Sequence, residues 1–330
     1  MVTLDKIRKP IGADLDAFDE FVVRNFTAEG ELLSDMLRYA LSARGKGIRP
    51  TVVLLAAGLN APVRRERMGQ RAYLAALLVE MIHVASLIHD DVVDETSLRR
   101  GVPTVNATWG NHLAVLVGDF FVSNALAAGI RTGHIKVISA LSALGKELSL
   151  GEVDQICNAR DHNLDERSYL DMIRKKTASL FMNCVRMGAE TVGVTDDESA
   201  QLVEFAELLG IAFQIRDDIF DYFDDPRIGK PTGNDLREGK VSLPLIYALR
   251  ADSPSPQAPA MRALLMRGDL STEDIETLVE FAKQQGGIEY SFDFMRRLQK
   301  QATHLLDRYP DSEWRQAFAQ LFEYIIARDR

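Results

Sequence analysis

Two short acidic runs carry the chemistry that this chain could perform. Residues 90–94 read Asp-Asp-Val-Val-Asp and residues 217–221 read Asp-Asp-Ile-Phe-Asp, so each run places carboxylates at positions i, i+1 and i+4. On a helix these carboxylates project from nearly the same side. Within an apolar stretch their desolvation and mutual repulsion are costly unless hard divalent cations lie between two facing runs. Carboxylate oxygens on Mg²⁺, with phosphate completing the coordination, are the expected chemistry.

The number of copies decides how these runs are interpreted. One Asp-Asp-x-x-Asp run alone fits a solvated helix end equally well, because acidic triplets are common on exposed helix ends. Here each of two copies ends an apolar helical stretch and is followed by a basic loop that contains glycine. This combination favours binding of metal and phosphate.

Basic side chains that could bind a diphosphate form a second group. Lys46 and Arg49 lie in a glycine-containing turn before a helix that we expect to begin at Pro50, and a helix N-terminus favours an anion. Each cation alone would be ordinary surface, but a diphosphate needs several such charges. The other candidates lie in the loops after the acidic runs or in a separate helix: Arg99, Arg100, Lys175, Lys176, Thr177, Lys230 and Lys240.

His83 lies on the same polar stripe as the first acidic run, two turns before Asp90. An isolated histidine on a buried helix is usually a satisfied core residue, but this position favours contact with a ligand. Residues 80–83 also match the Glu-x-x-His pattern of di-iron carboxylate bundles, which need a second copy. None of the other five histidines has a glutamate three residues before it, so we reject a di-iron site.

The elements that must position these residues are helices. Helical periodicity recurs almost throughout the chain, and alternation typical of strands is scarce. We expect an all-α fold, a single large helical bundle over 1–330 in which about 258–330 form a C-terminal extension. The expected helices span 13–43, 50–59, 66–95, 106–129, 133–149, 165–191, 197–224, 240–251, 258–268, 271–284, 286–309 and 311–328.

Composition limits the partners and the compartment. A net charge of −9 argues against a nucleic-acid partner, which would require a basic face. Cys157 and Cys184 have no metal-ligand spacing, which predicts free thiols in a reducing compartment. We find no signal-peptide layout and no apolar run of the roughly 20 residues that a bilayer span needs. We therefore expect a cytoplasmic protein, and peripheral contact with a membrane stays open.

Together these residues resemble the trans-isoprenyl diphosphate synthases, the polyprenyl synthetase family. The similarity runs from about Gly45 to Leu249 and is strongest at 86–94 with 99–101, and at 213–221. It implies a bundle of the isoprenoid synthase type with a central active-site cavity, and a homodimer. It also implies a Mg²⁺-dependent enzyme that ionises an allylic diphosphate primer and adds isopentenyl diphosphate units head to tail.

The resemblance further implies roles for individual residues. Asp90, Asp94, Asp217 and Asp221 would hold Mg²⁺ on the allylic diphosphate, supported through water by Asp91 and Asp218. Contacts to that diphosphate would come from Arg99, Lys176, Thr177, Gln214, Lys230 and Lys240, and the isopentenyl diphosphate would bind at Lys46, Arg49, His83 and Arg100. One departure is visible. The family usually reads Gly-Gly-Lys-Arg-x-Arg-Pro, and here Gly47 stands where the second basic residue is expected.

Small residues near the first acidic run predict a long product. Ala85 and Ser86 stand where short-chain members of the family carry bulky aromatics, so the resemblance implies a product of octaprenyl type, for quinone or carrier-lipid biosynthesis. Phe120 and Phe121 are candidates for the floor of the channel, and ordinary core aromatics explain them equally well. The alternatives are a short-chain (farnesyl or geranylgeranyl) synthase, a class I terpene cyclase, and a non-catalytic subunit of a heteromeric synthase. The second acidic run and the predicted pocket at Lys46, Arg49 and His83 favour a condensing enzyme.

Overall fold

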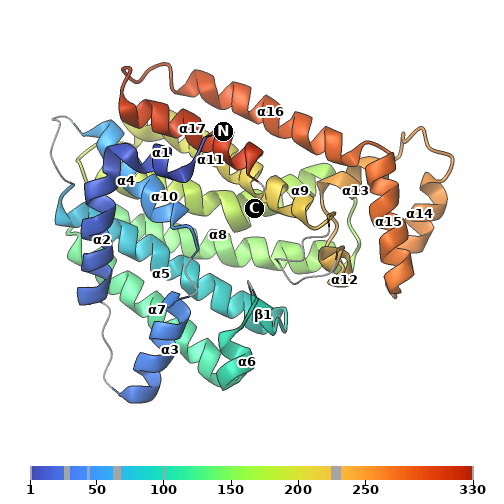
Figure 1. The fold of residues 1–330 in the computed structure, drawn as a ribbon, viewed down its shortest axis with the longest axis horizontal. Helices are drawn as coiled ribbons and strands as arrows, with labels where there is room; N and C mark the ends of the chain where they lie inside the picture. Colours follow the sequence, from blue (N-terminus) through green and yellow to red (C-terminus); the bar gives the residue numbers. More distant parts are fainter. Residues whose placement is uncertain are drawn as a thin grey trace. The chain divides into compact units, whose positions relative to one another are not determined.

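The computed structural model describes residues 2–25, 30–42, 45–61, 68–99, 101–223 and 232–328. Nearly all of the described chain is helical (Figure 1), and the predicted all-α fold is confirmed. The elements are α1 (Leu4–Arg8), η1 (Lys9–Ile11), α2 (Gly12–Asn25), α3 (Glu31–Ser42), α4 (Ile48–Asn60), α5 (Gln70–Val93), β1 (Leu98–Arg99), β2 (Val102–Pro103), α6 (Val105–Trp109), α7 (Asn111–Arg131), α8 (Ile135–Arg160), α9 (Glu166–Ile173), η2 (Arg174–Ala178), α10 (Ser179–Glu190), α11 (Asp196–Phe220), α12 (Asn234–Arg237), α13 (Leu243–Ala248), α14 (Ala258–Leu265), α15 (Thr272–Gln284), α16 (Gly287–Leu305) and α17 (Glu313–Ala327).

The chain forms two compact units, each built from several segments. The first unit comprises Met1–Gly145, Leu180–Ala206 and Leu305–Leu321. The second comprises Lys146–Ser179, Glu207–His304 and Phe322–Arg330. The single domain expected from the sequence, with its extension at 258–330, stays a prediction.

Helix α5 is the centre of the first unit. It packs against α4 on one side and α7 on another, and most of its side chains between Ala72 and Ile88 are buried. Small residues allow the close approach of α5 and α7. A Cβ atom at Gly118 of α7 would overlap the imidazole of His89, so a larger residue there would have to displace this ring. This packing holds the end of α5, where the first acidic run lies, in a fixed place.

In the second unit, the α-helical geometry changes to a short π-helix just before α10. Residues 174–178 form η2, a single π-helical turn between α9 and α10. Such π-turns are rare and occur frequently at functional sites, because the widened turn redirects side chains. Lys175, Lys176 and Thr177 all lie in this turn.

The observed helices differ from the expected ones in several places, and the helix expected at 133–149 continues to Arg160 as α8. The helix expected at 13–43 is two helices, α2 and α3, and Gly30 just before α3 has a φ of +94°. The helix expected at 106–129 is broken at Gly110, whose φ is +85°. Helix α4 begins at Ile48 instead of Pro50, because the left-handed Gly47 (φ +58°) serves as its N-cap. Glycine in the left-handed region ends regular helical geometry without a steric penalty.

Within the described residues, two helices, α5 and α7, are long and apolar enough, by length and composition alone, to cross a membrane. The expectation that no apolar run has this length is therefore wrong. In α5, 78% of the apolar window is buried, as in the core helix of a globular protein. In α7 only 39% of the corresponding window is buried, so much of its apolar surface is exposed.

Both cysteines are free, as predicted. Cys157 is exposed on α8, whereas Cys184 is buried in α10. Burial raises the pKa of the Cys184 thiol to about 12.

Candidate functional site

The first acidic run lies at the C-terminal end of α5, where the helix stops at Val93 and Asp94 is the C-cap. Asp91 is buried, and the β1–β2 hairpin brings Arg99 against it. Arg99 donates to Asp91 Oδ1 from Nε at 3.0 Å and from Nη2 at 2.7 Å. Asp91 is therefore committed to an ion pair with Arg99, whereas Asp90 and Asp94 are only partly buried.

A cavity of about 60 Å³ in the first unit is lined by His83, predicted to bind isopentenyl diphosphate, and by Arg99, predicted to bind the allylic diphosphate. Its lining includes Gly45, His83 and Arg99, so the loop that carries Lys46 and the histidine of α5 border the same space. The guanidinium of Arg49 lies 5.8 Å from the centre of the Phe181 ring. Arg100, the fourth residue predicted for isopentenyl diphosphate, lies outside the described residues.

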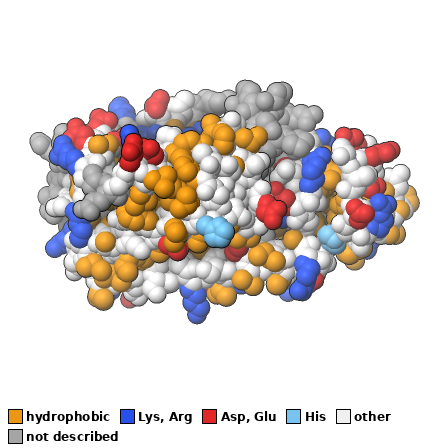
Figure 2. Space-filling model, turned by 90° about the horizontal axis from the view of Figure 1, so that it is seen from below, with side chains coloured by type: hydrophobic (Ala, Val, Ile, Leu, Met, Phe, Trp, Pro, Cys, Tyr) orange, Lys and Arg blue, Asp and Glu red, His pale blue; other side chains and the backbone are white. Residues whose placement is uncertain are grey.

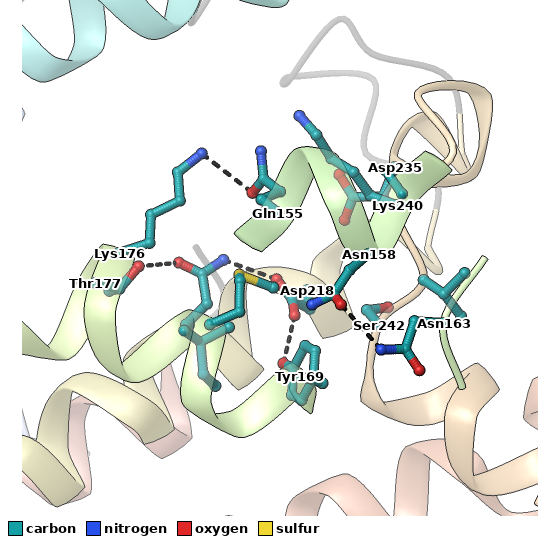
Figure 3. A pocket seen from close by; sticks show the side chains of 15 residues that line it. Gln155, Asn158, Asn163, Tyr169, Lys176, Thr177, Asp218, Asp235, Lys240 and Ser242 are labelled. Carbon is teal, nitrogen blue, oxygen red and sulfur yellow. Dashed lines mark hydrogen bonds between the residues drawn. The ribbon is translucent and has the colours of Figure 1, made fainter. Parts of the chain in front are cut away.

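The second acidic run is centred on Asp218, which is held by a chain of hydrogen bonds (Figure 3). Tyr169 donates its hydroxyl to Asp218 Oδ2 at 2.5 Å, and Gln214 donates its amide to Asp218 Oδ1 at 2.8 Å. Thr177 in turn donates to Gln214 Oε1 at 2.6 Å. These hydrogen bonds link the π-turn η2 to the acidic run through Thr177, Gln214 and Asp218, and Tyr169 holds Asp218 from α9.

Lys176 extends from η2 toward the C-terminal part of α8. Its Nζ donates to Gln155 Oε1 at 3.1 Å and forms an ion pair with Glu152. Lys175 is directed to Asp154 instead, with Nζ 2.8 Å from Oδ2, and the acidic groups around it raise its pKa to about 12. The π-turn therefore gives its two neighbouring lysines different partners, and Lys176 is the one that lines the cavity.

The outer carboxylates of the second run are engaged by protein groups. Asp217 forms an ion pair with Arg328 at 2.5 Å, and Arg328 also donates to the Phe213 carbonyl oxygen at 3.2 Å. Asp221 accepts hydrogen bonds from the backbone N–H groups of Asn234 and Asp235, each at 3.0 Å. Asp221 thus fixes the start of α12, a structural task that the sequence analysis did not foresee.

The carboxyl groups of Asp218 and Asp235 are costly to ionise, because burial and neighbouring carboxylates disfavour their charged forms. Burial raises the pKa of Asp218 to about 7, and the nearby Asp217 and Asp221 charges add to this. The pKa of Asp235 is raised well above its ordinary value by desolvation and by repulsion from Asp221 and Asp218. A bound cation would relieve this repulsion, and an all-oxygen donor set suits a hard divalent ion.

Asp235 and Tyr169 were not predicted as site residues. Asp235 carries a weak signal in the sequence, since it is an acidic residue five positions before Lys240 in the loop that follows the second run. Tyr169 carries none, because its role arises only from the packing of α9 on α11.

A cavity of about 190 Å³ in the second unit collects these groups (Figure 3). It is lined by five predicted residues, Lys176, Thr177, Gln214, Asp218 and Lys240, together with Asp235, Tyr169 and Gln155 among others. Lys240 donates to Glu238 Oε2 at 2.6 Å. Lys230 lies outside the described residues.

In the described ranges, no group of three acidic, histidine or cysteine side chains is arranged to hold a metal ion. A cation here would need ligands from phosphate and water in addition to carboxylates. Mg²⁺ in proteins commonly has such a shell, with one or two carboxylates and substrate phosphates.

The residues predicted to set product length lie on α5 and α7. Ala85 is buried, and Ser86 donates its hydroxyl to the His83 carbonyl oxygen at 2.9 Å. Phe121 is fully buried, whereas Phe120 is only partly buried. Their effect on product length stays a prediction.

Comparisons with known proteins point to one family. A family model described as polyprenyl synthetase matches residues 30–282. Octaprenyl diphosphate synthase of Escherichia coli (strain K12) is 34% identical over 330 residues, which cover 100% of both chains. Heptaprenyl diphosphate synthase component 2 of Geobacillus stearothermophilus is 35% identical over 321 residues, or 96% of each chain.

A solved structure shares the whole fold. Polyprenyl synthase from Caulobacter crescentus CB15, crystallised with calcium and isoprenyl diphosphate, superposes with a TM-score of 0.90 at 30% sequence identity. The superposition covers 99% of this chain and 98% of that one.

Proposed function

This chain belongs to the polyprenyl synthetase family, and on that premise we propose that it makes a long-chain all-trans polyprenyl diphosphate of about octaprenyl length. As a trans-prenyltransferase it condenses isopentenyl diphosphate with an allylic diphosphate. The cavity of the second unit is the main observation that supports assigning this activity to particular residues. There Lys176, Thr177 and Lys240 share one space with the carboxylate of Asp218.

Divalent-cation dependence belongs to the family, and we propose that Mg²⁺ is the ion used here. Asp90 and Asp94 would hold such an ion at the first run, Asp217 would hold another at the second run, and Asp218 would support this second site. When bound, the cation neutralises the diphosphate and so favours departure of this group from the primer.

The protein side chains perform the remaining work. Lys176 and Lys240 bind the oxygens of the allylic diphosphate and stabilise the negative charge that develops on it as the carbon–oxygen bond breaks. Thr177, fixed by Gln214, orients that diphosphate. Lys46, Arg49 and His83 hold isopentenyl diphosphate so that its alkene attacks the allylic carbocation. The released diphosphate then takes up the proton whose loss restores an allylic product.

Stabilisation of the negative charge on the diphosphate explains why this site favours ionisation of the allylic primer. A diphosphate leaving group carries about three negative charges, and fixed cations are worth more in a cavity shielded from water than in bulk solvent. No side chain has to attack the substrate, because the nucleophile is the alkene of the second substrate.

A product assay tests this function directly. Purified protein is incubated with farnesyl diphosphate, labelled isopentenyl diphosphate and Mg²⁺, and the extracted lipids are sized by chromatography. We expect label in polyprenyl products of about eight isoprene units. Label confined to products of four units or fewer would reject the long-chain proposal, and cyclic hydrocarbons would indicate a terpene cyclase.

A second candidate function is favoured by one relative. The heptaprenyl relative is described as component 2 of its synthase, so a requirement for a partner chain is a specific alternative. The assay distinguishes the two, because protein purified alone is active only if the chain is a complete catalyst. The sequence retains both acidic runs, which supports independent activity.

We further propose a homodimer that is formed through α7. Exposed hydrophobic side chains follow the outer side of this helix: Val115, Leu116, Val122, Leu126 and Ile130. Figure 2 shows hydrophobic side chains gathered on one face of the molecule. Exposed apolar patches of this kind mark sites of association. We also propose a cytoplasmic location. Peripheral contact with a membrane would allow release of the hydrophobic product, which would serve quinone biosynthesis.

A further inference from the structure

Arg8, the last residue of α1, contacts the loop that precedes α4. Its Nε donates to Thr51 Oγ1 at 3.0 Å, and its Nη2 donates to the Lys46 carbonyl oxygen. Thr51 is buried, and its hydroxyl donates in turn to the Gly47 carbonyl oxygen at 2.8 Å. One guanidinium therefore fastens both the loop and the first turn of α4.

Gly47 makes room for this arrangement. It adopts the left-handed conformation, and a Cβ atom placed on it would lie 3.2 Å from Arg8 Nη2. The guanidinium thus occupies the space where a side chain of residue 47 would begin. We propose that Arg8 is a positioning residue for the loop Gly45–Arg49, and that it supplies the positive charge that this loop lacks at position 47.

Packing sets the position of Arg8 in advance. The adjacent Ile7 and the nearby Ile11 are almost fully buried, and η1 packs against α4. Thr3 caps the N-terminus of α1 by accepting a hydrogen bond from Lys6 N at 3.4 Å. A guanidinium held in this way loses less side-chain entropy on binding an anion than a lysine on a free surface would.

The charges of the loop explain why the contact matters for binding. Arg8, Lys46 and Arg49 place three cations near the N-terminus of α4, which itself carries a partial positive charge. A multiply charged anion that binds at this loop gains from each of these charges. The inference rests on the proposed function, which assigns this loop to the diphosphate of isopentenyl diphosphate. Arg8 also holds the Lys46 carbonyl group, and so fixes the backbone from which the Lys46 side chain extends.

Steady-state kinetics of Arg8→Gln test the proposal. A charge-assisted hydrogen bond is lost, so we expect KM for isopentenyl diphosphate to rise on the order of tenfold. We expect KM for farnesyl diphosphate and kcat to stay within about twofold, because only one substrate site is affected. Gly47→Arg in the Arg8→Gln background returns a cation to the loop at the cost of strain in a left-handed position, so it reverses part of the rise in KM. Arg8→Lys, which keeps the charge and loses the two-point contact, gives an intermediate value.

Arg24→Gln is the matched control, since Arg24 is exposed on α2 and, among the described residues, pairs locally with Glu20 at 2.8 Å. An equal rise in KM in this control, or no rise in Arg8→Gln, would overturn the proposal. So would a uniform loss in all kinetic constants that tracks a lower melting temperature and is not restored by Gly47→Arg. Calorimetric titration of the metal-free protein with isopentenyl diphosphate tests the role of Arg8 separately from the proposed function. If the wild type binds but does not turn over, the proposed function fails, while weaker binding by Arg8→Gln still supports the role of Arg8.

Discussion

Asp90 and Asp217 are the carboxylates on which the proposed metal chemistry depends most. We expect Asp90→Ala and Asp217→Ala each to lower kcat by about 10³-fold or more, because charge stabilisation in the transition state is the largest contribution available. Incorporation of labelled isopentenyl diphosphate measures the rate, and circular dichroism confirms folding. Asp293→Ala is a suitable control, because its exposed carboxylate pairs with the neighbouring Arg296 among the described residues. A near-normal rate in either test variant would refute the assignment.

Asp218 makes the stability of the metal-free protein depend on pH. Its pKa is about 7 in the folded state against an ordinary value of 3.8, so the folded protein binds this proton more tightly. The resulting stabilisation is fully present below pH 3.8 and is lost as pH rises through 7, with an upper limit of about 4 kcal/mol.

We therefore expect the melting temperature in EDTA to fall between pH 5 and pH 8. Asp218→Asn should flatten this fall without abolishing it, because Asp235 is raised in the same direction. Thermal melts of both proteins across the range provide the measurement. Parallel curves for the variant and the wild type would show that Asp218 is not the group responsible.

At the scale of single elements, the close approach of α8 to η2 positions Lys176. A Cβ atom at Gly151 would lie 2.6 Å from the Lys176 backbone nitrogen. Gly151→Ala must therefore push the π-turn away, at a cost of about 1–3 kcal/mol. We expect a higher KM for the allylic primer and a lower kcat.

Gly145→Ala on the same helix is the matched control. A Cβ atom at this position has nothing within 4 Å, so the substitution is expected to stabilise the helix by about 0.4–1 kcal/mol. Denaturant unfolding and primer kinetics distinguish the two variants. If both behave alike, the contact at Gly151 has no part in positioning Lys176.

We predict that side chains of α5 just before the first acidic run limit the length of the product. Ala85 is buried, so enlarging it narrows any space beside it. We expect graded shortening of the polyprenyl product from Ala85→Val to Ala85→Phe, measured by chromatography of the extracted lipids. Circular dichroism controls for overpacking, which typically costs about 1–3 kcal/mol. An unchanged product in a folded Ala85→Phe enzyme would contradict the prediction.

The sequence predicted the long helices and five of the residues that line the cavity in the second unit, because apolar periodicity and the Asp-Asp-x-x-Asp spacing are local signals. It did not predict η2, since nothing in Arg-Lys-Lys-Thr-Ala distinguishes a π-turn from an α-helix. Tyr169 and Arg328 were also missed as site residues, because their contacts to Asp218 and Asp217 join segments 49 and 111 residues apart. Arg8 was missed for the same reason, as its partners lie about 40 residues away.

At the scale of the whole molecule, the apolar surface of α7 predicts the assembly state. Leu116 and Ile130 are 62% and 59% exposed. We expect Leu116→Glu with Ile130→Glu to convert a dimer into a monomer, because buried unpaired carboxylates strongly disfavour an interface. Light scattering after gel filtration measures the mass. Val23→Glu is the control, since Val23 is 75% exposed on α2. A monomeric wild type, or a dimer unaffected by both changes, would reject an interface at α7.

The contrast between the two thiols offers a spectroscopic handle on the cavity of the second unit. Maleimide dyes react with thiolates, and the Cys184 thiol, with its pKa near 12 and its burial, supplies almost none at neutral pH. Such a dye therefore attaches at Cys157 alone, beside Asn158 of the cavity wall. Fluorescence from that single label would follow substrate entry in the otherwise native enzyme, with no cysteine first removed by mutagenesis.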